Sequence, residues 1–243
     1  MKRILIISMV LLSLGMTTKA QTGKITRVFT MGNNCGSDTC YLWISFKNDK
    51  FDYVEMGINC EISANGKSTM ASATIDGDPN LYHNYKTSEK RVQEFRTFLD
   101  SLKIKFEEWT RIAKENNVTN YTKNLDEEKD VPIFFVCARK DGKLYSQNSE
   151  VNVKGCSPHF TVGSDGSCVM SFGWHILLHR SVGETTGFYS RYSHRESYTP
   201  LVYFAFRSPE EMQKLIDALD IESARQQLLK ENANGKKVDD LFK

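Results

Sequence analysis

Apolar side chains recur at steps of three and four residues between positions 88 and 116, and charged residues fill the other faces. This spacing places the apolar side chains on one face of an α-helix. Aromatic residues hold three of the seven positions, which favours packing across a sheet over a coiled coil. The sequence therefore predicts one long helix, with a stripe of Val92, Phe95, Leu99, Leu102, Phe106, Trp109 and Ala113.

A strand followed at once by a helix is predicted near the C-terminus. Residues 201–206 form an apolar, aromatic run of strand length. Ser208 can cap a helix by accepting from its free backbone N–H groups, Pro209 suits the first helical position, and Glu211 can reach back to the cap. The apolar spacing that follows predicts one helix with a stop near Gly235.

Short β-rich segments separated by turn residues fill most of the remaining chain. Asn48-Asp49 and Asp141-Gly142 are typical hairpin turns. Residues 32–40 and 181–197 are interpreted as loops. Strands are predicted over residues 25–31, 41–46, 51–59, 68–75, 81–85, 131–139, 143–146, 159–163, 168–174 and 176–182. The predicted fold class is α+β, with antiparallel β-meanders that are each followed by a covering helix.

Two features of the first half recur in the second. A Gly-Ser-Asp turn precedes the strand at Cys40 and again the strand at Cys168, and residues 98–104 resemble residues 215–221. Because the order is the same in both halves, we interpret them as a tandem pseudo-duplication. The expected parts are a signal peptide over 1–20, a first module over 21–125 and a second module over 126–243. Coincidence between two unrelated stretches of one larger sheet is the alternative.

The N-terminus has the pattern of an export signal. Lys2 and Arg3 precede a thirteen-residue apolar run over 4–16, and Ala20 lies at the expected cleavage point. The run is shorter than the roughly 20 residues that a spanning helix needs, and no second apolar span follows. We therefore expect an exported chain, in the periplasm or outside the cell, with no integral membrane span after leader removal.

Composition and charge describe an ordinary globular chain, 40% hydrophobic and 26% charged. Removal of the leader takes away Lys2, Arg3 and Lys19, so 32 basic residues become 29 against 30 acidic ones and the formal charge moves from +2 to −1. A nearly neutral chain gives no electrostatic case for nucleic acid as a partner. The six cysteines are an even number in an exported protein, which predicts disulfides.

The segment from Cys35 to Trp43, Cys-Gly-Ser-Asp-Thr-Cys-Tyr-Leu-Trp, resembles the Cys-Gly-Ser-Cys-Trp nucleophile motif of papain-like proteases. It departs from that motif by a two-residue insertion, and the family's nucleophile begins a helix whereas residues 41–46 are predicted as a strand. The helix N-terminus is part of what lowers the pKa of such a thiol. The resemblance therefore supports a cysteine hydrolase only as an alternative function.

A second group of residues has the side chains that zinc prefers. It consists of Cys156, His159, Cys168, His175 and His179. The segment Trp174–His179 lacks the Glu of the hydrolytic His-Glu-x-x-His arrangement, and the spacing of the two cysteines is not that of a zinc ribbon. A disulfide or plain packing is the favoured interpretation, so no metal and no cofactor are predicted.

The residues from 181 to 197 combine tyrosines, arginines and a histidine, a mixture typical of binding surfaces. Its partner would be an envelope protein, a glycan or a small anionic ligand. The sequence thus favours an exported, non-enzymatic binding protein. The alternative is a secreted hydrolase that uses a Cys nucleophile or a metal bound by Cys and His. The predicted binding residues are Tyr189, Arg191, Tyr192, His194 and Arg195.

Overall fold

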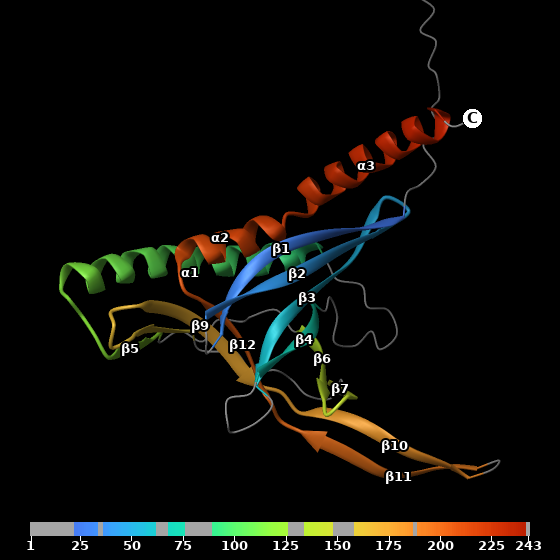
Figure 1. Ribbon diagram of the computed structural model, residues 1–243, viewed down its shortest axis with the longest axis horizontal. Helices are drawn as coiled ribbons and strands as arrows, with labels where there is room; N and C mark the ends of the chain where they lie inside the picture. The colour runs from blue at the N-terminus through green and yellow to red at the C-terminus, as the bar shows by residue number, and fades with distance from the viewer. Residues whose placement is uncertain are drawn as a thin grey trace, which may run out of the picture.

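The protein folds as one strongly curved antiparallel sheet with helices on its inner face (Figure 1). The computed structural model describes residues 22–33, 36–61, 68–75, 89–125, 134–147, 158–186 and 189–241. For residues 181–195 it describes the backbone alone. The α+β fold class predicted from the sequence is confirmed.

The described strands form a single twelve-stranded sheet. Ten of them follow the order β11-β10-β7-β6-β4-β3-β12-β9-β8-β5, and β1 and β2 join through β3. Their bounds are β1 (Gly23–Asn33), β2 (Gly36–Lys47), β3 (Lys50–Glu61), β4 (Ser68–Ile75), β5 (Tyr121–Asn124), β6 (Phe134–Lys140), β7 (Lys143–Gln147), β8 (His159–Val162), β9 (Cys168–His175), β10 (Leu178–Thr186), β11 (Tyr189–Tyr198) and β12 (Leu201–Phe206).

The sheet forks at β3, because two strands share one of its edges. The first half of β3 pairs with β2, whereas its last three residues pair with Leu201, Val202 and Tyr203 of β12. On its other side β12 pairs with β9 along its whole length. The predicted modules 21–125 and 126–243 are therefore joined in one sheet and one core. Whether they are copies of one another stays a prediction.

Two tight hairpins have the turn chemistry that the sequence predicted. Asn48 and Asp49 connect β2 to β3 with φ of 53° and 61°. Asp141 and Gly142 connect β6 to β7 with φ of 51° and 75°. Positive φ at both central residues is the geometry that matches the twist of the flanking strands. The predicted loop over 32–40 is wrong, since β1 runs to Asn33 and β2 begins at Gly36, and these two residues pair.

The long helix predicted from the apolar stripe is confirmed as α1 (Glu89–Glu115). Near the C-terminus the prediction of one helix is wrong. The chain forms α2 (Pro209–Ala218) and α3 (Ile221–Leu241), and α3 continues past Gly235. The break comes at Asp220, whose carboxylate accepts from the backbone N–H of Ser223 at 2.9 Å and so starts a new helix.

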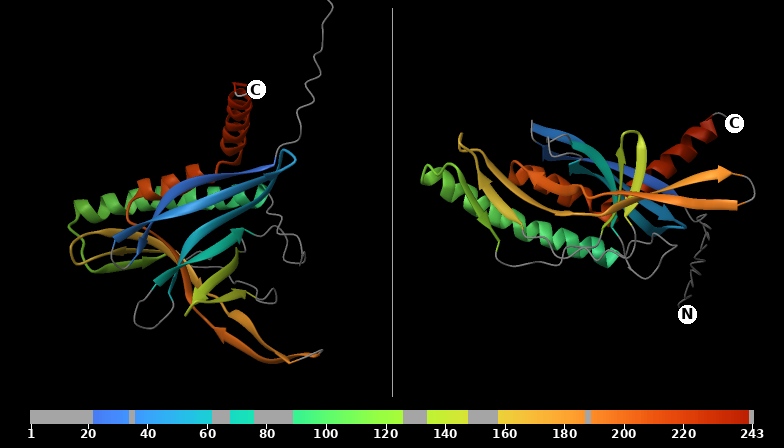
Figure 2. Two further views of the ribbon diagram at one scale, coloured as in Figure 1. Left: turned by 45° about the vertical axis from the view of Figure 1, so that its right-hand side comes forward. Right: turned by 90° about the horizontal axis from the view of Figure 1, so that it is seen from below.

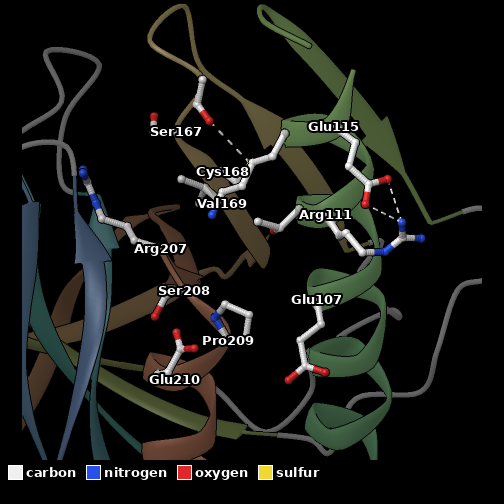
Figure 3. Close-up of a pocket in the computed structure, with 13 residues that line it drawn as sticks. Glu107, Arg111, Glu115, Ser167, Cys168, Val169, Arg207, Ser208, Pro209 and Glu210 are labelled. Atoms are coloured by element: carbon white, nitrogen blue, oxygen red, sulfur yellow. Dashed lines mark hydrogen bonds and ion pairs between the residues drawn. The ribbon is translucent and has the colours of Figure 1, made fainter. Parts of the chain in front are cut away.

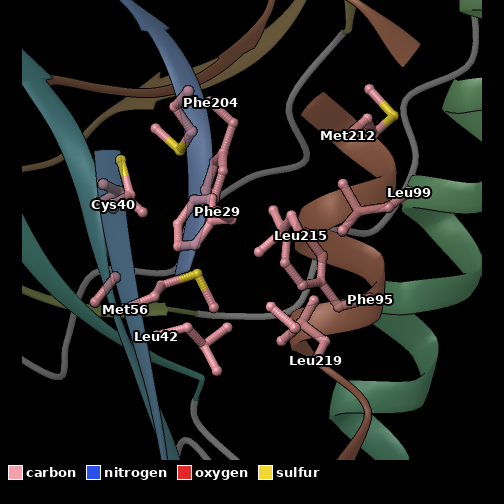
Figure 4. Packing of buried hydrophobic residues seen from close by; sticks show 14 of the residues in the cluster. Phe29, Cys40, Leu42, Met56, Phe95, Leu99, Phe204, Met212, Leu215 and Leu219 are labelled. Atoms are coloured by element: carbon pink, nitrogen blue, oxygen red, sulfur yellow. The ribbon is translucent and has the colours of Figure 1, made fainter. Parts of the chain in front are cut away.

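The core lies between the inner face of the sheet and the helices. Alternate residues of β1, β2 and β3, among them Phe29, Leu42 and Met56, are fully buried. Figure 4 shows α2 between this face and α1, with Leu215 directed at Phe29 and Phe95. The capping prediction is confirmed there: Ser208 accepts from the N–H of Glu211 at 3.3 Å.

A cluster of aromatic rings joins α1 to the centre of the sheet. Phe95 and Phe98 of α1 contact Phe172 and Phe204, with ring centroids 5.2 to 6.4 Å apart. Phe172 and Phe204 belong to the neighbouring strands β9 and β12 and lie 4.9 Å apart. Buried aromatic pairs add to the area that they remove from water, so this cluster holds helix and sheet together.

Two parts of the molecule leave the compact body (Figure 2). One is the ribbon of β10 and β11, and the other is α3, whose first turns pack through Ile221, Ala224 and Leu228 while Leu229 is exposed. Of the described helices, none combines the length and hydropathy needed to cross a bilayer. The predicted signal peptide, residues 1–20, and the predicted strand 81–85 lie outside the described residues.

Candidate functional site

The predicted loop over 181–197 is a β-hairpin, so that interpretation of its backbone is wrong. β10 and β11 pair from Leu178 and Tyr198 out to Thr186 and Tyr189. Only Leu178 and His179 of β10 also pair with β7. Beyond them, the described strands offer this ribbon no third partner. We call residues 180–186 and 189–196 the arm; Figures 1 and 2 show it reaching away from the helices.

The five predicted binding residues all lie on β11. Tyr189, Arg191 and Tyr192 occupy the outer part of the strand, and His194 and Arg195 the part nearer the body. The structure thus brings their backbones together on one strand; their side chains lie outside the described part of the chain. A register shift between Val182 and Gly183 leaves one extra residue on β11 between Tyr192 and His194. Such a bulge bends a ribbon and increases its twist.

A polar network anchors the arm to the body at Glu196. The hydroxyl of Tyr145 donates to its carboxylate at 2.9 Å, and Lys143 and Arg180 approach it at 3.6 and 3.5 Å. The ring of Tyr145 packs edge-on against Tyr198, with centroids 4.8 Å apart. One carboxylate therefore connects β7, β10 and β11 where the arm leaves the sheet.

The same contacts shift two titrations in opposite directions. The hydrogen bond from Tyr145, with the positive charges of Lys143 and Arg180, holds the pKa of Glu196 below its usual value. The hydrogen bond to Glu196 raises the pKa of Tyr145. Both shifts stabilise the state in which the phenol is protonated and the carboxylate is charged.

A cleft of about 620 Å³, which we call the polar cleft because most of its lining residues are polar or charged, lies away from the arm (Figure 3). It lies between the C-terminal half of α1, the turn between β8 and β9, and the start of α2. Figure 3 shows Arg207, Ser208 and Glu210 across the cleft from Glu107 and Arg111. The sequence interpretation missed this cleft because its three walls are far apart along the chain.

Opposite charges balance one another along the cleft. Arg111, Lys114 and Arg207 line it together with three glutamates. Arg111 is paired with Glu115 at 2.7 Å. Balanced charge gives such a cleft little attraction for ions of one sign. Its charged lining residues are Glu107, Arg111, Lys114, Glu115, Arg207 and Glu210.

The backbone groups at the start of α2 already have partners within the chain. The N–H of Glu211 donates to Ser208, and the N–H of Arg207 donates to the carboxylate of Glu211 at 2.7 Å. A hydrogen bond from Ser208 also lowers the pKa of Glu210. The helix N-terminus is thus capped by its own side chains. The cleft can accommodate polar groups but presents no catalytic arrangement among these residues.

Residues 166–169, which form another wall of the cleft, follow directly after the Gly-Ser-Asp turn that the sequence predicted before Cys168. The N–H of Ser167 donates to the carboxylate of Asp165 at 2.9 Å, and Gly166 has φ of 77°. The hydrogen bonds from Ser167 lower the pKa of Asp165, with a further contribution from Arg207. Asp165 therefore stabilises the turn.

The described cysteines do not form the expected disulfides. Cys40, Cys137 and Cys168 are free thiols. Burial raises the pKa of Cys40 to about 12, and burial together with the charge of Glu55 raises the pKa of Cys137. A thiol that stays protonated at neutral pH is a poor nucleophile, so neither suits the hydrolase alternative. The side chains of Cys35, Cys60 and Cys156 lie outside the described residues.

The predicted alternative of a zinc site is not assembled by the described histidines and Cys168. His159 pairs across the sheet with Ser171, His175 with Leu201 and His179 with Ser146. Across the described part of the chain, no three His, Cys, Asp or Glu side chains gather as metal ligands would. Cys156 lies outside that part.

Comparison of this chain with protein-family models, with curated proteins and with solved structures gives no match.

Proposed function

We propose that this chain is an exported, non-enzymatic envelope protein that binds a protein partner along the arm. The observation that carries the proposal is the length of ribbon beyond His179 with no third strand among the described residues. A two-stranded ribbon in water is marginally stable on its own. A partner that added a strand to β11 would supply backbone hydrogen bonds along its open edge.

The residue types on the arm support the same function. Tyr and Arg are enriched among the residues that dominate binding energies, and Tyr189, Arg191, Tyr192 and Arg195 lie within seven positions of one strand. His194 would add a further donor. An open strand edge favours a protein over a glycan or a small anion, because only a polypeptide can continue the ladder.

Export is part of the proposal. The basic start, the short apolar run and the small residue at Ala20 support a cleaved leader. The mature chain would then meet its partner in the periplasm or outside the cell.

The first test removes side chains from the arm. The variant carries Tyr189→Ala, Arg191→Ala, Tyr192→Ala and Arg195→Ala, and its control, Lys90→Ala with Arg91→Ala, removes the same number of positive charges from the exposed start of α1. We expect the arm variant to keep the Tm of the parent and to lose cross-linking to its envelope partner. The control should cross-link as the parent does.

The second test removes the arm itself. Arg180 and Glu196 are cross-strand partners, so an Asn-Gly turn can replace residues 181–195 between them. This change keeps the network around Glu196. Retained cross-linking by the shortened protein would overturn the proposal. Unfolding of both the quadruple variant and the shortened protein would show that those four residues serve the fold, whereas a stable shortened protein would show that the body folds without them.

A further inference from the structure

A second cavity, distinct from the arm and the polar cleft, opens at the β5 end of the sheet. It has a volume of about 300 Å³ and lies between α1, β5 and β8. Pockets for small ligands begin at about this size. Its principal walls are Trp109 and Ile112 of α1, Tyr121 and Lys123 of β5, and Phe160 and Val162 of β8.

The shape of this pocket is set by the end of α1. The N–H of Val118 donates to the carbonyl of Ala113 at 2.9 Å, and the N–H of Asn117 donates to that of Lys114 at 3.3 Å. Asn117 has φ of 52°. These are the two bonds and the left-handed residue of a Schellman motif, which ends a helix in one defined geometry. Both apolar members of the motif, Ala113 and Val118, line the pocket, so this wall is fixed before any ligand arrives.

The opposite wall is held by the sheet. Tyr121 pairs with Val162 and Lys123 with Phe160 in the β5–β8 ladder. The ring of Phe160 packs edge-on against Trp109, with centroids 5.7 Å apart. A preformed pocket binds with little loss of side-chain freedom.

The pocket is apolar except for one cation at its rim. The ammonium of Lys123 lies 4.5 Å from the centroid of the Trp109 ring. No ion pair joins Lys123 to a carboxylate of the described chain. The rim also leaves Tyr121 and Ile112 exposed, at 48% and 41%. Apolar walls with one ammonium at the rim complement a molecule that has an apolar chain and one negative charge.

We propose that this pocket binds a small amphipathic carboxylate, with the apolar part against Trp109, Phe160 and Val162 and the carboxylate paired with Lys123. A peptide strand added to β5 is disfavoured, because β5 has only four residues and carries a lysine. Short strands and lysines are the devices that protect sheet edges from pairing. The site shares no residue with the arm, so it is independent of the function proposed above.

The test compares octanoate with 1-octanol by isothermal titration calorimetry on the full chain. We expect octanoate to bind more tightly than octanol, and Lys123→Met to weaken octanoate about two- to fivefold while octanol stays unchanged. Lys123→Arg should restore most of the loss. Raised salt should reduce the difference between the two ligands, since the ion pair is exposed. Lys105→Met, which changes an exposed lysine of α1 outside the pocket, is the matched control.

Three results would overturn the proposal. The first is that neither compound binds. The second is that octanoate and octanol bind with equal affinity, both to the parent and to Lys123→Met. The third is that Lys105→Met weakens octanoate binding as much as Lys123→Met does. A fluorescence measurement locates the ligand. The substitutions Trp43→Phe and Trp174→Phe leave Trp109 as the remaining one of the chain's three tryptophans. A brominated octanoate should quench it in the parent and in the protein without the arm. Binding without quenching would place the ligand elsewhere and reject the site.

Discussion

At the β5 end of the sheet a helix lies over the last strands, whereas at the β11 end the last two strands leave the body uncovered (Figure 2). Phe106 and Trp109 of α1 pack against Phe160 at the first end, with centroids 6.0 and 5.7 Å apart. At the second end, hydrogen bonds and charges around Glu196 make the connection. Apolar burial stabilises by its area, but exposed ion pairs contribute little. We therefore expect the two ends to open at very different free energies.

The largest effect is expected from Phe160→Ala. Phe160 is 2% exposed and joins β8 to α1, so its truncation should lower the free energy of unfolding by about 3–5 kcal/mol. Urea denaturation measures the loss, and Phe160→Leu, which keeps most of the volume, is the control. A loss below about 1 kcal/mol would mean that apolar packing does not make the β5 end more stable than the β11 end.

A smaller effect, equal at both ends, is expected from Ser208→Ala. It removes the cap of α2, the helix between sheet and α1, and should cost about 1 kcal/mol. Hydrogen exchange should then accelerate in the globally protected amides, without changing which end opens first. Ser208→Asp keeps an acceptor and should restore the parent's value. Loss of hydrogen-exchange protection at one end only would show that α2 stabilises that end alone.

A local effect is expected from Tyr145→Phe. The change removes the hydrogen bond to Glu196 and keeps the ring against Tyr198. Amides of β10 and β11 should exchange faster, while the global unfolding midpoint stays close to that of the parent. Tyr41→Phe, on an exposed position of β2, serves as the control. Equal exchange rates in the two variants would contradict the anchoring role of Glu196.

The smallest effect is a pH dependence confined to the arm. Because the pKa of Glu196 is lowered in the fold, its contribution is complete above the ordinary value of 4.5 and is lost as pH falls through the lowered pKa. Because the pKa of Tyr145 is raised, its contribution is complete below 10 and is lost as pH rises through the raised pKa. After correction for intrinsic rates, protection of the arm should be flat between these limits and fall below about pH 4.5. A fall in the protection of the arm at neutral pH would show that a titratable group other than Glu196 and Tyr145 controls its opening.

Sequence reasoning succeeded where one face of an element is buried. The stripe of α1 predicted its bounds within about one residue, and the Asn48 and Asp141 turns were recognised because positive φ favours those residue types. It failed at the arm, because the sequence there is mostly polar and has no alternation of apolar residues to indicate strands. It also missed the start of α3, because the apolar spacing continues from Leu219 across the cap at Asp220.

The candidate sites show the same limit. Residues on β11 were chosen for their chemistry, and their place on one strand could not be read from composition. The apolar pocket was missed because Trp109 was assigned to the helix stripe and Lys123 was not predicted to lie on a strand. The pairing of β5 with β8, strands distant in the chain, holds Lys123 in the sheet beside Trp109.

The position of β12 has a consequence for how the chain folds in time. This strand is the last of the sheet to be synthesised, yet it lies between β3 and β9 and joins the two parts of the sheet. Contacts between segments so far apart in the chain raise the contact order, and their loop-closure entropy must be overcome before they contribute. A nascent chain that ends before Leu201 leaves both neighbouring edges unpaired. Synthesis must therefore be nearly complete before the sheet closes.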